Sequence, residues 1–273
     1  MSARAHEVIS ALKKDTLLSL LKRNERLDGR RLDEYRDIDI KVNLVGKAEG
    51  SALVHLGGTK VIAGVKISVG KPFPDTPNKG VLIVNAELIP VASPTFEAGP
   101  PGEDDVELAR VIDRGIRSAP MLDLEKLVLV PGEKVWTVFV DIYTLDHDGN
   151  LFDAAGLAAT AALLTSKLRE AKVEDGELKI TDNVVPLPLK SVPVFVTVAK
   201  IGNKLLLDPT YEEELVMDAR ITFAFNEEGE ICCIQKGGAG SFSYDEILQA
   251  MEMAREAAHK LRARLPPKIG ANV

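Results

Sequence analysis

The chain has 273 residues, of which 45% are hydrophobic and 27% are charged, and this composition excludes a largely disordered or fibrous protein. Its net charge of -7 argues against a self-sufficient nucleic-acid binder, because neutralising phosphates requires clustered Lys and Arg side chains. The sequence has no apolar run of about 18 residues, and residues 1–15 lack a signal-peptide pattern, so we expect a cytoplasmic protein without membrane contact.

The first half of the chain is predicted to consist of grouped strands followed by helices. Hydrophobic residues recur at a 3.6-residue period within an N-terminal helical segment, residues 1–27. Further helices are expected at 103–118, where three acidic residues suit a helix N-terminus, and at 154–169. Loops rich in proline are expected at 70–80 and 93–102. Strand patterns occur at 38–42, 51–56, 59–67, 81–89, 127–130 and 135–143.

The second half repeats this order on a smaller scale. Its strand patterns lie at 194–201, 204–207, 219–225 and 231–235, and a last helix is expected at 244–265. Strands grouped before a helix in both halves indicate an α+β architecture. The predicted divisions are an N-terminal helix (1–27), an N-terminal domain (28–170), a linker (171–192), a C-terminal domain (193–265) and a tail (266–273).

Cysteines and glycines give no sign of a metal or cofactor site. Cys232 and Cys233 are neighbours in a predicted strand and point to opposite faces, so we interpret them as small core residues rather than a disulfide. Residues 237–240 (GGAG) lack the Lys-[Ser/Thr] ending of a phosphate-binding loop and predict a strand-to-helix turn, with Ser241 or Ser243 as the helix N-cap. The scattered histidines predict no zinc site, and we expect no cofactor.

Five short stretches occur in a specific order along the chain. They are 30–36 (RRLDEYR), 48–52 (AEGSA), 96–101 (FEAGPP), 107–114 (ELARVIDR) and 207–214 (LDPTYEEE). Each stretch is weak evidence alone, but the ordered set resembles RNase PH-like proteins, and within them the non-catalytic RNase PH-like subunits of the archaeal exosome. The resemblance covers residues 28–265, which is nearly the whole chain.

This resemblance implies an RNase PH-like fold of two related βαβ-type halves, with mixed sheets packed against helices. It also implies a heterodimer with a catalytic RNase PH-like exosome subunit, three of which form a hexameric ring that carries RNA-binding cap subunits. In such a complex, the partner degrades single-stranded RNA from the 3′ end with inorganic phosphate, and a role in rRNA processing follows. We therefore expect this chain not to be an enzyme by itself.

An arginine stripe on the predicted helix 103–118 is the candidate RNA-binding surface. Arg110, Arg114 and Arg117 are spaced four and three residues apart, which places them on one helix face. Arginine forks suit bidentate contacts with phosphate, although cations near a helix C-terminus also occur on plain solvated faces. The resemblance matches Arg110 and Arg114 to RNA-binding positions, and leaves open whether Arg117 reaches RNA or the partner. Further candidates for this basic surface are Arg26, Arg30 and Arg31.

The turn before the predicted helix 154–169 departs from the pattern of catalytic relatives. They carry Gly-[Ser/Thr]-Arg here, which binds inorganic phosphate at a helix N-terminus. This chain instead has Gly149 and Asn150, without the hydroxyl and the arginine, and Asp146, Asp148 and Asp153 add negative charge around the turn. We therefore predict that no phosphate binds here and that Asp153 is an ordinary helix N-cap.

An acidic cluster follows in the second half and contains Asp208, Glu212, Glu213, Glu214 and Asp218. By resemblance, the catalytic aspartate of the family aligns with Glu214, which is one methylene longer. A catalytic carboxyl must lie within hydrogen-bond reach of the leaving oxygen, so this change matters. The segment is about two residues shorter than in catalytic members, which leaves Asp218 as the alternative. We interpret the cluster as a solvated acidic turn and a degenerate active site.

The sequence leaves three functions open. The first is a structural and RNA-positioning exosome subunit, which binds RNA weakly by itself and better inside a basic channel. The second is an active phosphorolytic 3′-to-5′ exoribonuclease, which the altered phosphate turn and Glu214 oppose. The third is an interaction scaffold without RNA contact, for which Arg110 and Arg114 should lie on an ordinary surface.

Overall fold

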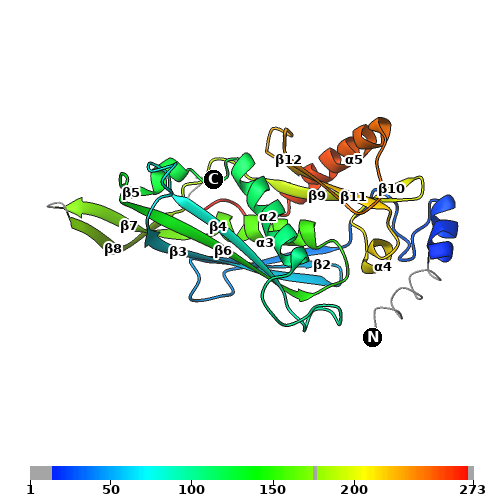
Figure 1. The fold of residues 1–273 in the computed structure, drawn as a ribbon, viewed down its shortest axis with the longest axis horizontal. Helices are drawn as coiled ribbons and strands as arrows, with labels where there is room; N and C mark the ends of the chain where they lie inside the picture. The colour runs from blue at the N-terminus through cyan, green and yellow to red at the C-terminus, as the bar shows by residue number, and fades with distance from the viewer. Residues whose placement is uncertain (1–13, 175–176, 270–273) are drawn as a thin grey trace.

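The computed structural model describes residues 14–174 and 177–269, and Figure 1 shows the arrangement of their elements. Residues 14–22 are helical, whereas the earlier part of the predicted N-terminal helix, 1–13, lies outside the described residues. The first half contains β1 (Ile38–Val42), β2 (Gly50–Leu56), β3 (Thr59–Gly70), β4 (Val81–Leu88), α2 (Glu103–Ser118), η1 (Leu124–Leu127), β5 (Val128–Val130), β6 (Lys134–Asp146) and α3 (Leu151–Leu164). The second half contains β7 (Lys167–Glu174), β8 (Glu177–Pro186), β9 (Val194–Ile201), β10 (Lys204–Leu207), α4 (Tyr211–Glu214), β11 (Ala219–Phe225), β12 (Ile231–Gly237) and α5 (Tyr244–Arg262).

Two sheets form the framework, and each belongs to one half of the chain. The larger sheet has the strand order β1-β2-β3-β6-β4, with β5 also paired to β6. Its strands pair antiparallel except for β4 and β6, which are parallel, so the sheet is mixed as expected. The smaller sheet is antiparallel with the order β10-β9-β11-β12. Mixed sheets packed against helices confirm the predicted α+β class.

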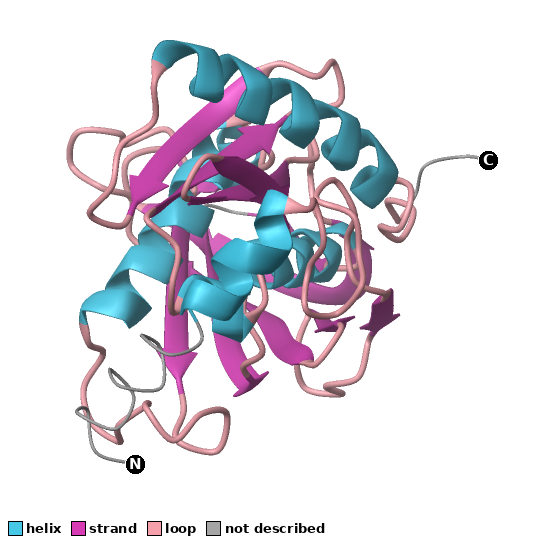
Figure 2. Ribbon diagram, turned by 90° about the vertical axis from the view of Figure 1, so that its right-hand side faces the viewer, coloured by secondary structure: helices cyan, strands magenta, loops and turns pink. Residues whose placement is uncertain are grey.

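The helices lie in layers between and outside these sheets. Helix α3 contacts β2 and β3 of the larger sheet and β9 of the smaller one, so it is sandwiched between them (Figure 1). Helix α2 packs against β4 and reaches β12. Helix α5 covers the outer face of the smaller sheet through β9 and β11, and Figure 2 shows it at the top of the molecule. Strand β6 leads directly into the N-terminus of α3, where the first half meets the second.

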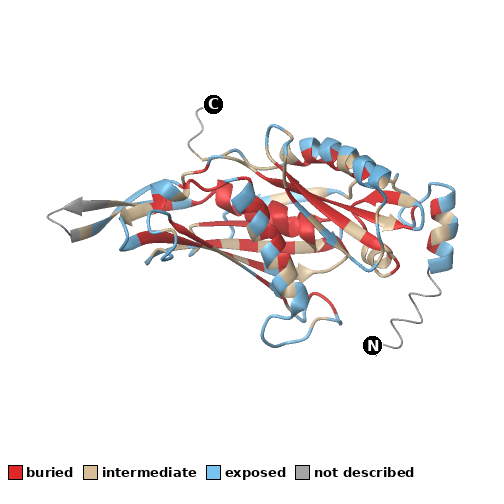
Figure 3. Cartoon of the chain, turned by 45° about the horizontal axis from the view of Figure 1, so that its top comes forward, coloured by how far each residue is buried: buried red, intermediate tan, exposed pale blue. Residues whose placement is uncertain are grey.

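Helix α3 forms the centre of the core because it is apolar on all sides. Its residues from Phe152 to Leu164 are all buried, as Figure 3 shows in red, and a helix that is hydrophobic all round belongs inside a protein. Gly156 is required where the helix meets the smaller sheet, since a Cβ atom there would lie 2.4 Å from the Phe195 ring. This close packing fixes the position of the N-terminus of α3.

The ends of two helices differ from the sequence prediction. Helix α3 spans Leu151–Leu164 rather than 154–169, because the hydroxyls of Thr165 and Ser166 bond back to carbonyls of the last turn and strand β7 then begins. Helix α5 ends at Arg262 rather than at 265. Its predicted cap is confirmed at Ser243, whose hydroxyl accepts from Glu246 N.

A two-stranded hairpin, β7 with β8, projects from the end of the larger sheet in Figure 1. It occupies most of the segment 171–192 that was predicted to be a linker, and its first strand begins at Lys167. Alternation of apolar and polar residues in 178–181 was the available strand signal, and the polar, proline-containing composition concealed it. The domain limits themselves stay a prediction.

Several smaller predictions also have an outcome in the structure. Cys233 is buried as predicted, whereas Cys232 is partly exposed, and both cysteines are free. Gly238 adopts a φ of +84°, which confirms the expected turn that favours glycine. No helix within 14–174 and 177–269 is both long and apolar enough to cross a membrane.

Candidate functional site

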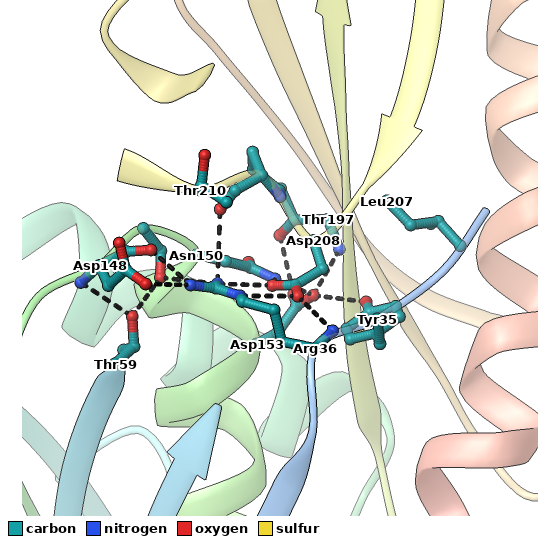
Figure 4. Close-up of polar contacts among 12 residues, drawn as sticks. Tyr35, Arg36, Thr59, Asp148, Asn150, Asp153, Thr197, Leu207, Asp208 and Thr210 are labelled. Atoms are coloured by element: carbon teal, nitrogen blue, oxygen red, sulfur yellow. Dashed lines mark hydrogen bonds and ion pairs between the residues drawn. The ribbon is translucent and has the colours of Figure 1, made fainter. Parts of the chain in front are cut away.

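A buried carboxylate, Asp208, lies where the two halves of the chain meet (Figure 4). It accepts hydrogen bonds from Arg36 Nη2 at 2.7 Å and Nε at 2.9 Å, and from Arg30 Nη1 at 2.9 Å. The Asn150 amide adds a third donor at 2.8 Å. Burial alone would raise the pKa of Asp208, but the bonds and charges of Arg36 and Arg30 lower it below its usual value. Asp208 is therefore an ionised anchor between the two halves.

Asn150 and Asp153 continue this network at the N-terminus of α3. Asn150 is the N-cap residue in a left-handed conformation, with a φ of +55°. Asp153 is fully buried and accepts from Asn150 Nδ2 at 2.8 Å, Tyr35 Oη at 2.6 Å and Thr197 Oγ1 at 2.8 Å. Burial raises the pKa of Asp153 to about 6 against the effect of these bonds. The prediction of Asp153 as the N-cap was therefore wrong, because this side chain joins α3 to strand β9 instead.

The arginines of the N-terminal segment are part of the same interior. Arg26 is buried and forms a bidentate pair with Glu213, at 2.8 Å and 2.5 Å. Arg30 is held by Asp28 and Asp208, so neither guanidinium is available to extend a basic surface as predicted. Arg31 is exposed, but it pairs with Asp33 at 2.9 Å.

The acidic cluster is consequently not a solvated turn, as the sequence was interpreted to indicate. Asp208 and Glu213 are buried because arginines approach them from segments more than 170 positions away in the sequence. Arg36, which carries much of this network, was also missed. Its only sequence signal was its place within the 30–36 stretch.

A pocket of about 160 Å³ opens beside the N-terminus of α3. Its walls include Phe96, His147, Phe152, Glu214 and Arg220. The His147 ring stacks on Phe96 with centroids 5.3 Å apart, and burial together with the Arg36 charge lowers the pKa of His147 to about 4. His147 therefore contributes a neutral aromatic wall at physiological pH. Sequence reasoning did not place it there.

Glu214 accepts the backbone N–H that this pocket would otherwise offer to a bound anion. Its Oε1 accepts the Asn150 backbone N–H at 2.8 Å, which is the donor that a free helix N-terminus would present to a phosphate. Burial raises the pKa of Glu214 to about 7, while this bond and Arg220 oppose the shift. The other candidate, Asp218, instead accepts from Gly202 N at 2.6 Å and does not line the pocket.

The arginine of the pocket, Arg220, is paired. Arg220 Nη2 lies 2.6 Å from Glu107 Oε2, and the guanidinium rests 4.6 Å from the Phe152 ring centroid. No group of three or more His, Cys, Asp or Glu side chains among residues 14–174 and 177–269 is arranged to hold a metal ion. The pocket thus presents carboxylates and aromatic rings rather than unpaired cations.

The predicted arginine stripe lies on the solvent-exposed side of α2, and its three arginines differ in their contacts. Arg110 and Arg114 are exposed, and neither has an ion pair or hydrogen bond within the described parts of the chain. Arg117 differs, because its Nε lies 2.8 Å and 2.9 Å from the two oxygens of Asp113. Arg110 is one turn from Glu107, which lines the pocket, and Arg114 lies one turn farther along α2.

Comparison with known proteins follows the same division of the chain. Residues 34–169 match domain 1 of the 3′ exoribonuclease family, and residues 191–257 match domain 2. A curated relative, the exosome complex component Rrp42 of Thermococcus gammatolerans, is 52% identical over 267 residues, which cover 97% of this chain and 98% of the relative.

Solved structures agree with this relation. A chain of the Archaeoglobus fulgidus exosome with RNA bound to the active site is 47% identical, with a TM-score of 0.87, and the match covers 94% of this chain and 99% of that chain. Rice (Oryza sativa) Rrp46 has the same fold at 20% identity, with a TM-score of 0.67 over 87% of this chain and 97% of that chain.

Proposed function

Because the chain belongs to the 3′ exoribonuclease family, with both family domains present in order, we propose that it is an exosome component that positions RNA but performs no catalysis itself. One observation carries the proposal. Two unpaired arginines, Arg110 and Arg114, follow Glu107 on α2, and Glu107 lines a pocket in which the carboxylate of Glu214 already holds the N–H at the start of α3 that would bind phosphate.

The internal carboxylate explains why phosphorolysis would fail in this pocket. Phosphate would have to displace Glu214 from the Asn150 N–H and then lie against a second anion when Glu214 is ionised. Arg220 could offset that repulsion, but Glu107 already neutralises it at 2.6 Å. The pocket therefore lacks a free cation for the attacking phosphate, and the 3′ exoribonuclease chemistry belongs to another subunit.

The arginines on α2 supply the RNA-binding part of the proposal. Arg110 and Arg114 project two guanidiniums from one helix face, a geometry that suits neighbouring phosphates of a single strand. The net charge of -7 makes the isolated chain a weak RNA binder. RNA would bind firmly only where other subunits add their own cations.

The partners follow from the family and from similarity to chains of archaeal exosomes. The proposal includes a catalytic RNase PH-like subunit as direct partner, three such heterodimers in a hexameric ring, and RNA-binding cap subunits on that ring. It also includes single-stranded RNA as the substrate of the complex, a contribution to rRNA processing, and a cytoplasmic location. The 47% identity to a chain of the Archaeoglobus fulgidus exosome supports this assembly.

Binding of inorganic phosphate tests the non-catalytic part directly. We expect no saturable binding by the isolated chain in calorimetry, whereas a catalytic family member should bind phosphate under the same conditions. Saturable binding at neutral pH would contradict the proposal. Reconstitution with the catalytic partner then tests the RNA-positioning part, through the affinity for RNA with and without Arg110 and Arg114.

A further inference from the structure

A second cavity, a groove of about 400 Å³, lies at the C-terminal end of α2. The pocket beside α3 is near the other end of this helix, where Asp104, Glu107 and Leu108 line it. The groove is bounded by Ile116 and Arg117 of α2 and by the loop that joins β3 to β4. Its volume is within the range of ligand-binding clefts. It belongs neither to the degenerate active site nor to the buried network around Asp208.

The groove is locally cationic on an acidic protein. Its lining includes three cations, Lys79, Arg117 and Lys190, and two carboxylates, Asp123 and Glu125. Lys190 Nζ lies 3.0 Å from Asp123 Oδ1, and Lys126, just outside the lining, lies 3.4 Å from the other oxygen of the same carboxylate. When Glu125 and the Arg117 partner Asp113 are counted, four cations stand against three carboxylates, and this excess of one positive charge favours an anionic ligand.

The lining also includes one aromatic ring at its rim. Phe73 is 51% exposed and lines the groove, so its ring is accessible to a ligand there. Its loop is held in place by backbone bonds, from Thr76 N to Phe73 O, from Gly80 N to Leu124 O and from Gly132 N to Pro77 O. An exposed ring on a fixed loop is a suitable platform for stacking a nucleobase.

Arg117 connects this groove to the arginines that the proposed function uses. It is in the groove lining and also follows Arg110 and Arg114 on the same face of α2. The rise of about 1.5 Å per residue puts Arg117 roughly 10 Å along the helix from Arg110. A single strand held by Arg110 and Arg114 can therefore continue into the groove without crossing an anionic pocket.

We propose that this groove is a second RNA subsite, in which a nucleotide beyond the Arg110–Arg114 contacts stacks its base on Phe73 while Lys79 and Lys190 face its phosphates. The proposal rests on the proposed function, since α2 must first hold the strand. The combination of an exposed ring, excess cations and continuity with α2 favours RNA over a peptide segment of another protein.

The test uses the reconstituted complex with its catalytic partner and oligoadenylates of increasing length. Phe73→Ala should weaken binding at least about fivefold, the effect of losing one base–aromatic stack, and only for RNA long enough to pass the α2 arginines. Tyr244→Ala is the matched control, because Tyr244 is 74% exposed on α5, away from the groove. Its RNA affinity should equal that of the wild type.

Three other outcomes would overturn the subsite. If Phe73→Ala has no effect while Arg110→Ala/Arg114→Ala weakens binding, the groove is not an RNA subsite, but the proposed function is still supported. If neither variant changes RNA affinity, both proposals fail. If Phe73→Ala disrupts assembly with another protein subunit but not RNA affinity, the groove is a protein contact instead. As a second readout, RNA with a single 5-bromouracil should crosslink to the peptide containing Phe73 in the wild-type complex, and absence of that crosslink at every probe position would contradict the subsite.

Discussion

Two groups of arginines in this molecule have opposite environments. Arg26 and Arg36 are buried in the network around Asp208, and every described guanidinium there has a carboxylate or carbonyl partner. Arg110 and Arg114 are exposed on α2 without any such partner in the described residues. The comparison shows that an arginine is available to RNA only where the fold leaves it unpaired, and sequence proximity to a motif does not determine that.

The buried group should dominate stability, and Asp208→Ala is the variant that breaks it most completely. Removing the carboxylate leaves Arg36 and Arg30 buried without their shared anion, which costs about 3–5 kcal/mol of unfolding free energy for a buried pair. Denaturant unfolding measures this loss. The control is Asp33→Ala, which removes an exposed pair with Arg31 and should cost less than about 1 kcal/mol. Equal losses in the two variants would contradict the contrast.

Glu214→Gln tests the buried region through pH. The folded-state pKa of Glu214 is about 7, above its ordinary value of 4.5, so between these pH values the folded protein keeps a proton that the unfolded chain has lost. Raising the pH through that window therefore lowers the unfolding free energy, and glutamine removes this loss. The stability of the variant relative to the wild type should rise by an amount on the order of 2 kcal/mol between pH 5 and pH 8.

Two neighbours titrate in the same range but are common to both proteins. The pKa of Asp153 is raised to about 6, and that of His147 is lowered to about 4. Because His147 Nε2 lies 3.9 Å from Glu214 Oε2, the difference between Glu214→Gln and the wild type in thermal unfolding across pH reports Glu214 together with its coupling to His147. A difference that does not change with pH would show that Glu214 has an ordinary pKa.

The exposed group should dominate RNA binding and contribute little to stability. Arg110→Ala/Arg114→Ala in the reconstituted complex should weaken RNA binding about tenfold or more, and should reduce the slope of log affinity against log salt by about 0.7 for each lost phosphate contact. The midpoint of thermal unfolding should stay unchanged. Arg255→Ala on α5 is the control, because Arg255 is also exposed on a helix but lies outside the α2 face. An unchanged salt dependence in the double variant would contradict direct phosphate contact.

Arg117 is intermediate between the two groups, and its effect should be the smallest. Its guanidinium is partly exposed and already bonded to Asp113, so Arg117→Ala should change stability by less than about 1 kcal/mol. Its effect on RNA affinity should be smaller than that of Arg110→Ala in the same filter-binding series. A larger effect than that of Arg110→Ala would mean that RNA displaces Asp113.

Much of the fold could be predicted from the sequence because its signals are local. The period of α2 and its acidic first turn predicted that helix at Glu103–Ser118, and the apolar run VFVTVAKI predicted β9 at Val194–Ile201. The hairpin β7–β8 was missed, because its polar composition resembles that of a linker. Local pattern identifies an element best when its apolar residues are buried in the core.

The candidate site could be predicted only in part, because its key contacts are between distant segments. The sequence shows that neither a hydroxyl residue nor an arginine follows Gly149 at Asn150 and Leu151, and the reading of this turn as a degenerate phosphate site stays a prediction. The sequence did not show that Glu214 bonds to Asn150, which is 64 positions away. It also did not show that Arg36 bonds to Asp208, which is 172 positions away. Asp153 was taken for a cap because residue type alone does not reveal a partner such as Tyr35.

Phosphorolysis by a reconstituted complex tests the central claim most directly. Degradation of a polyadenylate and release of nucleoside diphosphates would be followed for this chain alone, for the catalytic partner alone, and for their mixture. The account predicts no product from this chain, rapid product from the mixture, and slower product when the mixture contains Arg110→Ala/Arg114→Ala. Robust phosphate-dependent product from this chain alone would contradict it, because Glu214 would then have to act as a competent catalytic carboxyl.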